Sequence, residues 1–110
     1  MGLQMTVQTQ AVLRVLLDDP LGEHYGLEIA QAAGLRSGSL YPILARLERE
    51  GWATSDWEQV NQRQVGRPRR RYYTLTPDGA VWAEQALVDT VRRLSPGRGS
   101  VATPRLVPGQ

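Results

Sequence analysis

Cysteine, lysine and phenylalanine are all absent from this chain of 110 residues, and His24 is its only histidine. Without cysteine the chain has no disulfide, no thiolate metal site and no cysteine nucleophile. A lone histidine does not form a histidine metal site, and no Ser-His-acid or paired-carboxylate pattern stands out. The sequence therefore predicts a protein that is not an enzyme and that holds no metal or cofactor, with His24 at its surface.

Long apolar runs are missing as well. A membrane-spanning helix needs about 20 apolar residues, whereas the apolar runs here are only a few residues long. The N-terminus also lacks the apolar core of a secretory signal. Because hydrophobic residues make up 41% and charged residues 22% of the chain, as in ordinary soluble domains, we expect one cytoplasmic domain without a membrane partner.

The positive charges have an uneven distribution, although the formal net charge is only +2. Every basic residue is an arginine, and five of them fall within nine positions: Arg63, Arg67, Arg69, Arg70 and Arg71. Arginine offers paired donors that suit phosphates and guanine edges. The all-arginine usage has an alternative explanation in genomic base composition, but the clustering does not. The cluster indicates a nucleic-acid partner.

The stretch from Ser37 to Gly51 is a predicted amphipathic helix. Its apolar residues recur at i, i+3, i+4 and i+7 and so share one face: Leu40, Ile43, Leu44 and Leu47. The outer face carries Tyr41, Ala45, Arg46 and Arg49. We expect the N-cap at Gly38 or Ser39, Pro42 in the first turn and the end at Gly51. Both a DNA-reading helix and an ordinary solvated helix fit this pattern.

Two further helices are expected before this one. Thr6–Asp19 carries a broad apolar face, with the threonine as N-cap, and Pro20 follows its end. A second helix is predicted to begin near His24-Tyr25-Gly26 and to end at Gly34, which suits a left-handed C-cap. Because only residues 35–38 separate it from the third helix, the two form a candidate helix-turn-helix.

The chain changes character after Gly51. Residues 52–58 and 71–76 are rich in aromatic and β-branched residues and read as strands, joined by the polar, basic loop 59–70. Thr76-Pro77-Asp78 is a helix start, with an N-cap, a proline at the first helical position and an acid in the first turn. The helix that follows should cover the core with one side and expose an apolar partner surface on another.

These elements predict a mainly α fold with a small β-hairpin, a winged helix-turn-helix over residues 6–76. A C-terminal helix with an exposed partner surface is expected at 77–94, and a disordered tail rich in Pro, Gly and Ser at 95–110. In such a fold the third helix enters the major groove, while the wing meets the DNA backbone or minor groove.

Several short motifs support this prediction: Tyr25-Gly26, Ser39-Leu40-Tyr41-Pro42, Arg46-Leu47-Glu48, Gly51, Gly66-Arg67, Arg71-Tyr72-Tyr73, and Leu75-Thr76 with Gly79. In this combination, over roughly residues 10–80, the chain resembles the PadR family of bacterial transcriptional regulators. The resemblance implies a dimer that binds a palindromic operator in double-stranded DNA and usually represses. Family members dimerise through C-terminal helices, and the single helix here is similar to the shorter subfamily.

We assign DNA contact to ten residues: Ser37, Ser39, Tyr41, Pro42, Arg46, Arg49, Arg67, Arg69, Arg70 and Arg71. Ser37 and Ser39 are placed to bind phosphate, with simple N-capping as the alternative. For Arg46 and Arg49 the alternative is an ion pair with a neighbouring glutamate. Dimerisation is assigned to Trp82, Leu87, Val91 and Leu94. Packing in the core and a ligand pocket at the dimer interface are the other possibilities for Trp82.

The segment Gly66-Arg67-Pro68-Arg69 also resembles the core of an AT-hook. On this hypothesis Arg67 and Arg69 enter a narrow minor groove, whereas the alternative is a solvated run of charge. Arg71 starts a strand and serves to neutralise phosphate, and Tyr72 and Tyr73 are assigned to structure.

The predicted function is a homodimeric transcriptional repressor, with a small-molecule effector as a possible further partner. The alternative is a winged-helix module that binds proteins and not DNA. The arginine-rich wing argues against that alternative, because a protein-binding version has no need of such a tip.

Overall fold

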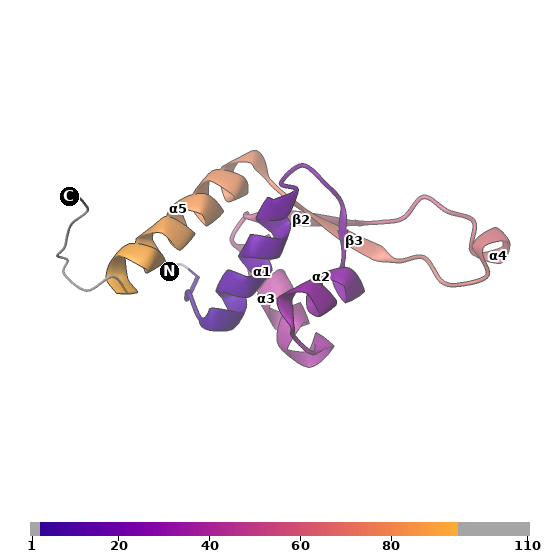
Figure 1. The fold of residues 1–110 in the computed structure, drawn as a ribbon. Helices are drawn as coiled ribbons and strands as arrows, with labels where there is room; N and C mark the ends of the chain where they lie inside the picture. The colour runs from indigo at the N-terminus through magenta and orange to yellow at the C-terminus, as the bar shows by residue number, and fades with distance from the viewer. Residues whose placement is uncertain (1–2, 95–110) are drawn as a thin grey trace.

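A computed structural model of the chain describes residues 3–94, so the tail expected at 95–110 lies outside the described residues. The elements in chain order are α1 (Val7–Asp18), β1 (His24–Tyr25), α2 (Gly26–Ala33), α3 (Ser37–Arg49), β2 (Ala53–Trp57), α4 (Gln62–Val65), β3 (Arg71–Leu75) and α5 (Pro77–Leu94). Helices α1, α2 and α3 form the body, while the β2–β3 wing and α5 extend from it in opposite directions (Figure 1). No helix among residues 3–94 is long and apolar enough to cross a membrane.

The first helix has the predicted bounds, and the reason lies in its ends. The Thr6 hydroxyl accepts a hydrogen bond from the Thr9 amide at 3.1 Å, and the helix ends before Asp19, which precedes Pro20. Its inward face, with Val12, Leu13 and Leu16, is fully buried.

The second helix begins at Gly26, the last residue of the predicted start His24-Tyr25-Gly26. His24 and Tyr25 instead form the short strand β1, which pairs antiparallel with β3 in the register His24↔Tyr73 and Tyr25↔Tyr72. The sheet therefore has three strands in the order β1-β3-β2, and the predicted two-stranded hairpin is incomplete. Pairing with β1 gives the second edge of β3 hydrogen-bond partners that a two-stranded hairpin would leave open.

The start of α3 also differs from the prediction. The N-cap is Arg36 and makes no side-chain capping bond, so the expected cap at Gly38 or Ser39 is wrong. Instead, the amides of Ser39 and Leu40 both donate to the Arg36 carbonyl at 3.0 Å. Pro42 consequently lies in the second turn, inside the helix. The cost of its missing N–H is limited because Pro42 and Gly38, whose carbonyl loses that bond, are both exposed to water.

Glycines end α2 and α3 as predicted. Gly34 has φ 70° and Gly51 has φ 81°, a left-handed conformation that glycine adopts without penalty. The Leu35 amide donates to the Ala30 carbonyl at 2.9 Å, and the Trp52 amide donates to the Leu47 carbonyl at 2.8 Å. Both ends are Schellman motifs, and each reverses the chain within a few residues.

The start of α5 is tied to the corner between α3 and β2. The Thr76 hydroxyl accepts from the Gly79 amide at 2.8 Å, as predicted for an N-cap, and donates to the Gly51 carbonyl at 2.9 Å. A Cβ at Gly79 would collide with the Trp52 carbonyl. Glycine is therefore required for the first turn of α5 to pack this closely.

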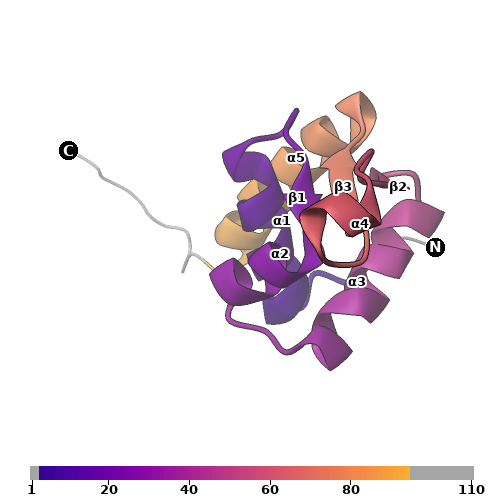
Figure 2. The same cartoon turned by 90° about the vertical axis from the view of Figure 1, so that its right-hand side faces the viewer.

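The core lies where α1, α2, α3, the sheet and the first half of α5 meet (Figure 2). Its buried apolar residues are Val12, Leu13, Leu16, Ile29, Ala30, Leu40, Leu44, Leu47, Ala53, Tyr73, Leu75 and Ala83. As predicted, Tyr73 and Leu75 are both buried, one strand period apart. The outer part of the wing extends beyond the core, and its loop contains an unexpected single turn of helix, α4, which is capped by Asn61 and ended by Gly66.

Candidate nucleic-acid interface

The outer face of α3 exposes the residues that the sequence assigned to DNA reading. Tyr41, Arg46 and Arg49 are all exposed, and so is Pro42. At 3.6 residues per turn, five positions correspond to about 140°, so Tyr41 and Arg46 lie on opposite flanks. Arg49 falls between them. The helix thus presents one aromatic flank, one cationic flank and a second arginine at its centre.

The Tyr41 flank faces the wing. Tyr41 borders a groove that also contains Tyr25, Gly26 and Arg70. Its hydroxyl approaches Gly26 so closely that a Cβ at that position would collide with it. The ring therefore rests against the first turn of α2 and still exposes 45% of its surface. Tyr41 both sets the packing of α2 on α3 and remains accessible to a partner.

The Arg46 flank faces the N-terminal segment instead. Arg46 lines a concave site of about 250 Å³ together with Ser39, Pro42, Ile43 and residues from the segment before and at the start of α1. Neither Arg46 nor Arg49 makes an ion pair or a side-chain hydrogen bond within residues 3–94. The predicted alternative, pairing with a neighbouring glutamate, is therefore wrong. Both guanidinium groups are available to an external acceptor.

Ser37 and Ser39 are exposed in the first turn of α3. Because Arg36 is the N-cap, the capping alternative for these serines is wrong. Within the described part of the chain their hydroxyls make no hydrogen bond. They are therefore open donors at the positive end of a helix dipole, an arrangement that suits phosphate.

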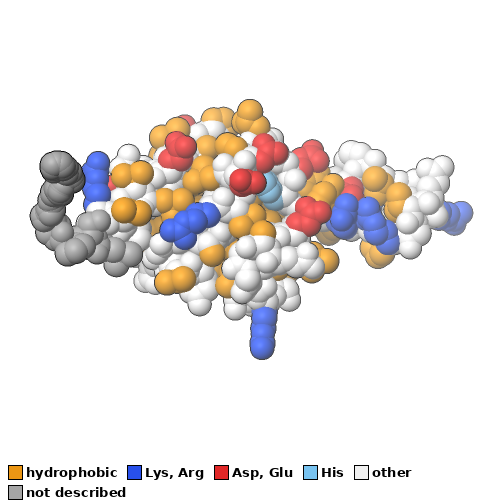
Figure 3. Space-filling view, in the orientation of Figure 1, with side chains coloured by type: hydrophobic (Ala, Val, Ile, Leu, Met, Phe, Trp, Pro, Cys, Tyr) orange, Lys and Arg blue, Asp and Glu red, His pale blue; other side chains and the backbone are white. Residues whose placement is uncertain are grey.

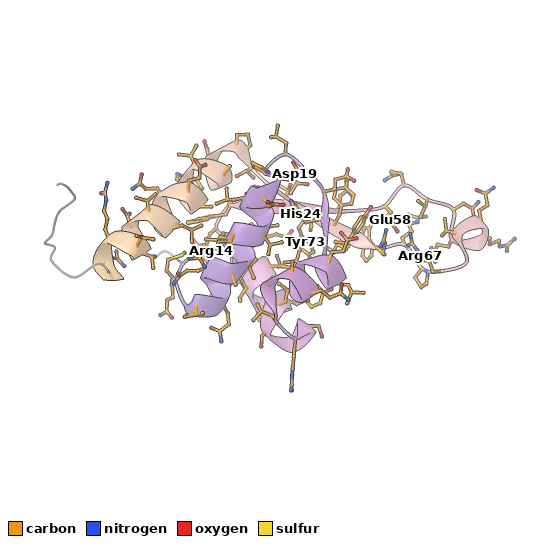
Figure 4. All side chains as sticks on the ribbon, viewed as in Figure 1. Arg14, Asp19, His24, Glu58, Arg67 and Tyr73 are labelled. Carbon is orange, nitrogen blue, oxygen red and sulfur yellow. The ribbon has the colours of Figure 1, made fainter. Side chains whose placement is uncertain are left out.

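A buried carboxylate that the sequence analysis missed lies at the base of the wing. Glu58 is only 6% exposed and follows β2 directly. Its Oε1 accepts from Arg67 Nη1 at 2.6 Å and from the Arg70 amide at 2.8 Å. Its Oε2 accepts from Arg67 Nη2 at 3.3 Å and from Arg70 Nη2 at 3.2 Å. Figure 4 shows Glu58 and Arg67 facing each other across the two arms of the wing.

The electrostatics of this site follow from its partners. The hydrogen bond from Arg67 is the main cause that lowers the pKa of Glu58 from 4.5 to about 2; burial opposes this shift, and the Arg70 amide and guanidinium add to it. The same bond raises the pKa of Arg67. Glu58 is therefore ionised at every physiological pH.

Arg67 does not take the extended conformation that an AT-hook requires. Its Nη1 also donates to the Pro68 carbonyl at 3.0 Å, so its guanidinium turns back into the wing. The strand register explains why, because Trp57 pairs with Arg71 and the Glu58 amide donates to the Arg70 carbonyl at 2.9 Å. Continued by one residue, this observed register places Glu58 opposite Arg70, whereas the sequence predicted the two strands without a register and so gave no signal for the pairing.

Arg70 and Arg71 are also engaged within the protein. The Arg70 guanidinium lies 3.9 Å above the Tyr25 ring, whose edge meets Tyr72. Arg71 donates to the Ser55 hydroxyl through Nε at 3.0 Å and Nη2 at 2.7 Å. That hydroxyl donates in turn to Glu48 at 2.6 Å. Both arginines remain about 45% exposed and can still neutralise phosphate.

Arg69 differs from its neighbours in the wing. It is exposed and, within residues 3–94, has no hydrogen bond, ion pair or ring contact. It borders a surface hollow with Trp57, Gln62 and Pro68. Basic side chains colour the wing in the space-filling view (Figure 3).

The residues assigned to dimerisation fall on two sides of α5. Trp82 stacks at a tilt on Trp52, with ring centroids 5.8 Å apart, and remains 43% exposed. Val91 is exposed, together with Val81 and Val88, which widen the apolar surface. Leu87, in contrast, packs partly against the core of its own chain. The side chain of Leu94 lies outside the described part.

Comparison with known proteins places this geometry in context. A sequence model of the transcriptional regulator PadR-like family matches residues 12–85. No curated protein matches the chain. Many solved structures share its fold, including the PcaV transcriptional regulator from Streptomyces coelicolor in complex with its natural ligand (TM-score 0.64, 22% identity). That match covers 80% of this chain and 57% of PcaV.

Two further structures extend the comparison. BpsR of Bordetella bronchiseptica, whose DNA binding is regulated by 6-hydroxynicotinic acid, has 19% identity and a TM-score of 0.62 over 81% of this chain and 57% of BpsR. A protein of Ralstonia eutropha proposed to bind DNA has 25% identity and a TM-score of 0.58 over 76% of this chain and 98% of its own. The chain thus spans little more than half the length of PcaV and BpsR. The winged-helix fold class predicted from sequence is confirmed.

Proposed function

The chain belongs to the PadR-like family of transcriptional regulators, and we propose that it acts as a homodimer that binds a palindromic operator in double-stranded DNA and represses transcription. Membership of this family makes it a transcription factor and not an enzyme. The observation that carries the proposal is the set of exposed arginines on α3 and on the wing whose side chains have no partner among the described residues: Arg46, Arg49, Arg63 and Arg69.

In this proposal α3 lies in the major groove. Arg46 and Arg49 reach phosphates or the O6 and N7 atoms of guanine, and Tyr41 and Pro42 form the apolar part of the contact. Ser37 and Ser39 bind a phosphate at the N-terminus of the helix. These two kinds of residue are given different roles because of their chemistry. The arginines on the outer face offer paired donors that suit guanine, whereas the serine hydroxyls lie beside the free amides of the helix N-terminus, which suit phosphate.

The wing makes the second contact. The free guanidinium of Arg69 enters the minor groove, where narrow A·T-rich segments concentrate negative potential. Arg70 and Arg71 lie closer to the body and neutralise backbone phosphates from their half-exposed positions. Arg67 contributes mainly positive charge to the field, because Glu58 and the Pro68 carbonyl already occupy its donors.

Dimerisation is proposed to occur through α5. Val81, Val88 and Val91 form an exposed apolar surface on a helix that extends from the body, and the exposed Trp82 lies beside this surface, about 180° around the helix from Val91. A second copy of the same helix is the simplest occupant, because a two-fold contact pairs this patch with itself. Two α3 helices would then contact half-sites about one helical turn, roughly 34–36 Å, apart.

A small-molecule effector is a further element of the proposal. BpsR responds to 6-hydroxynicotinic acid and PcaV was solved with its natural ligand. In this chain the exposed Trp82 ring, which stacks on Trp52 beside the proposed dimer surface, offers a platform for a planar ligand. Binding there would change the angle between the two copies and hence the spacing of the α3 helices.

Selection from a random pool of duplex DNA tests the function. The expected result is an inverted-repeat consensus whose binding weakens steeply with salt, since several phosphates are neutralised. Analytical ultracentrifugation of the same sample is expected to show a dimer at micromolar concentration. A pool that shows no enrichment at moderate salt would contradict DNA binding and favour a module that binds proteins.

A further inference from the structure

We propose that Glu58 is a positioning residue of the wing, which holds Arg67 and Arg70 within the hairpin so that Arg69, alone among Arg67, Arg69, Arg70 and Arg71, presents a free guanidinium to the minor groove. This inference rests on the proposed DNA binding and specifies how the wing performs it. It assigns different roles to arginines that are nearly adjacent in sequence and identical in charge.

Several hydrogen bonds converge on Glu58. Four donors from two residues occupy both carboxylate oxygens, at distances from 2.6 to 3.3 Å. The Glu58 amide adds a fifth bond, to the Arg70 carbonyl at 2.9 Å. The last bond continues the β2–β3 ladder beyond Trp57↔Arg71. The carboxylate therefore closes the base of the loop formed by residues 59–69.

The contacts of Glu58 also connect the wing to the body of the protein. Arg70 is held by Glu58 on one side and stacks on Tyr25 at 3.9 Å on the other. Tyr25 directly precedes Gly26, against which the Tyr41 hydroxyl packs. The orientation of the wing is thus related to α3 through a short chain of packed side chains.

Arg69 lies between the two arginines that Glu58 holds. Arg67 and Arg70 are both held by Glu58, so the backbone on each side of Arg69 is restrained while its own side chain is exposed and unpaired within the described residues. Pro68 further limits the backbone because its ring sets φ. The backbone of an arginine presented in this way loses little conformational freedom on binding, so that the entropic cost is confined to the side chain.

Insertion of Arg67, as in an AT-hook, is the competing arrangement. It would remove two of the four donors from a carboxylate that is 6% exposed, and would leave that negative charge beside DNA phosphates. Insertion of Arg69 breaks no contact among the described residues. The structure therefore favours Arg69 as the reading residue and Arg67 as part of the support.

The test compares E58Q with the matched control D56N. Both variants remove one negative charge from the same hairpin, but Asp56 is exposed and, among residues 3–94, accepts only from the next amide, that of Trp57 at 2.8 Å. Affinity is measured for the selected operator and for random duplex. For E58Q we expect the operator-to-random ratio to fall by about tenfold, the size of one lost specific contact, and for D56N we expect an unchanged ratio.

A double-mutant cycle with R69Q separates positioning from a general loss of structure. Glu58 and Arg69 make no contact with each other, yet the proposal requires their effects to be coupled. R69Q should reduce the ratio by about tenfold in the wild-type background and by less than threefold in E58Q. Additive effects would overturn the proposal, and so would an E58Q variant that binds the operator more tightly than D56N does.

Two further measurements keep the test decisive. If E58Q does not fold, R67Q breaks the same support from the other partner and should lower the ratio to the same degree. An unchanged ratio for a folded R67Q would overturn the proposal. Amide hydrogen exchange in the DNA-free protein should rise across residues 59–70 in E58Q but not in D56N. If the two variants exchanged equally fast, the claim that Glu58 holds the wing loop would be overturned. Failure of the wild type to bind any DNA would instead refute the proposed function.

Discussion

The Tyr41 hydroxyl in α3 packs against Gly26 at the start of α2, so closely that no side chain fits between them. This contact sets the approach of the two helices of the helix-turn-helix. Gly26 is buried, whereas Tyr41 keeps 45% of its surface exposed on the proposed DNA face. A substitution at Gly26 would therefore change the position of Tyr41 in the proposed interface without itself being exposed to DNA.

Gly26→Ala is expected to displace the Tyr41 ring and to weaken operator binding, while leaving the fold intact. The ring has room to move outward because it is partly exposed, so the cost in the free energy of unfolding should stay below about 1 kcal/mol. Chemical denaturation and operator titration give the two quantities. An unchanged operator affinity would contradict a role for Tyr41 at the interface.

Gly79→Ala is the informative contrast. Alanine is the better helix former by about 1 kcal/mol, but here its Cβ would meet the Trp52 carbonyl, which is backbone and cannot rotate away. We expect a net destabilisation of about 1–3 kcal/mol. Urea unfolding measures it, and a variant as stable as the wild type would show that α5 shifts freely against the β2 corner.

Arg46→Ala is expected to lower operator affinity by about 1–3 kcal/mol and to relax preference at one base position. Its guanidinium is exposed and makes no ion pair within residues 3–94. Arg14→Ala, which removes an exposed arginine on α1, is the control of equal charge (Figure 4). The DNA sequences selected by Arg46→Ala should differ from those selected by the wild type, whereas those selected by Arg14→Ala should not. If Arg46→Ala selected the same sequences as the wild type, the face of α3 that reads the bases would have been assigned wrongly.

Val88→Glu is expected to dissociate the dimer. Val88 is 46% exposed on the apolar surface of α5, and a carboxylate buried there in each copy would lose hydration without gaining a partner. Leu21→Glu introduces the same group at a position 85% exposed, before β1, and should leave the dimer intact. Sedimentation velocity distinguishes the two, and a dimeric Val88→Glu protein would refute dimerisation through this surface.

The wing should lose order in acid. The pKa of Glu58 is about 2 in the folded protein, below its ordinary value of 4.5, so its contacts stabilise the wing fully above pH 4.5. That contribution is lost progressively as the pH falls from 4.5 toward 2. NMR signals of the Arg70 amide report the loss directly. In E58Q the same signals should show no such titration, and an identical acid transition in both proteins would assign it to other carboxylates.

Much of the fold could be predicted from local sequence. Thr6 and Thr76 are side-chain N-caps, and Gly34 and Gly51 stop helices through left-handed conformations. These caps depend on hydrogen bonds and backbone conformations of residues only a few positions apart, within a single helical turn. The winged helix-turn-helix was predicted for the same reason, because each of its main elements carries its own periodicity.

The errors occurred where a distant segment determined the outcome. His24 and Tyr25 are a strand because β3 lies beside them, almost fifty positions later in the chain. The start of α3 is a local exception, because the turn closed by the Leu35 amide immediately before it brings the helix start forward to Ser37 and leaves Pro42 inside the helix. Local propensity is a weak influence that tertiary contacts readily override.

The candidate site divides in the same way. Sequence alone determined that α3 exposes arginines and that the wing is basic, because helical period and composition fix those properties before any packing occurs. Only the tertiary structure decided which of Arg67, Arg69 and Arg70 has no partner among the described residues. Glu58 reaches Arg67 and Arg70 through the register of two strands, and a carboxylate removed from water must collect such donors. The charge of the wing is thus a property of its sequence, and its division into support and contact is a property of its fold.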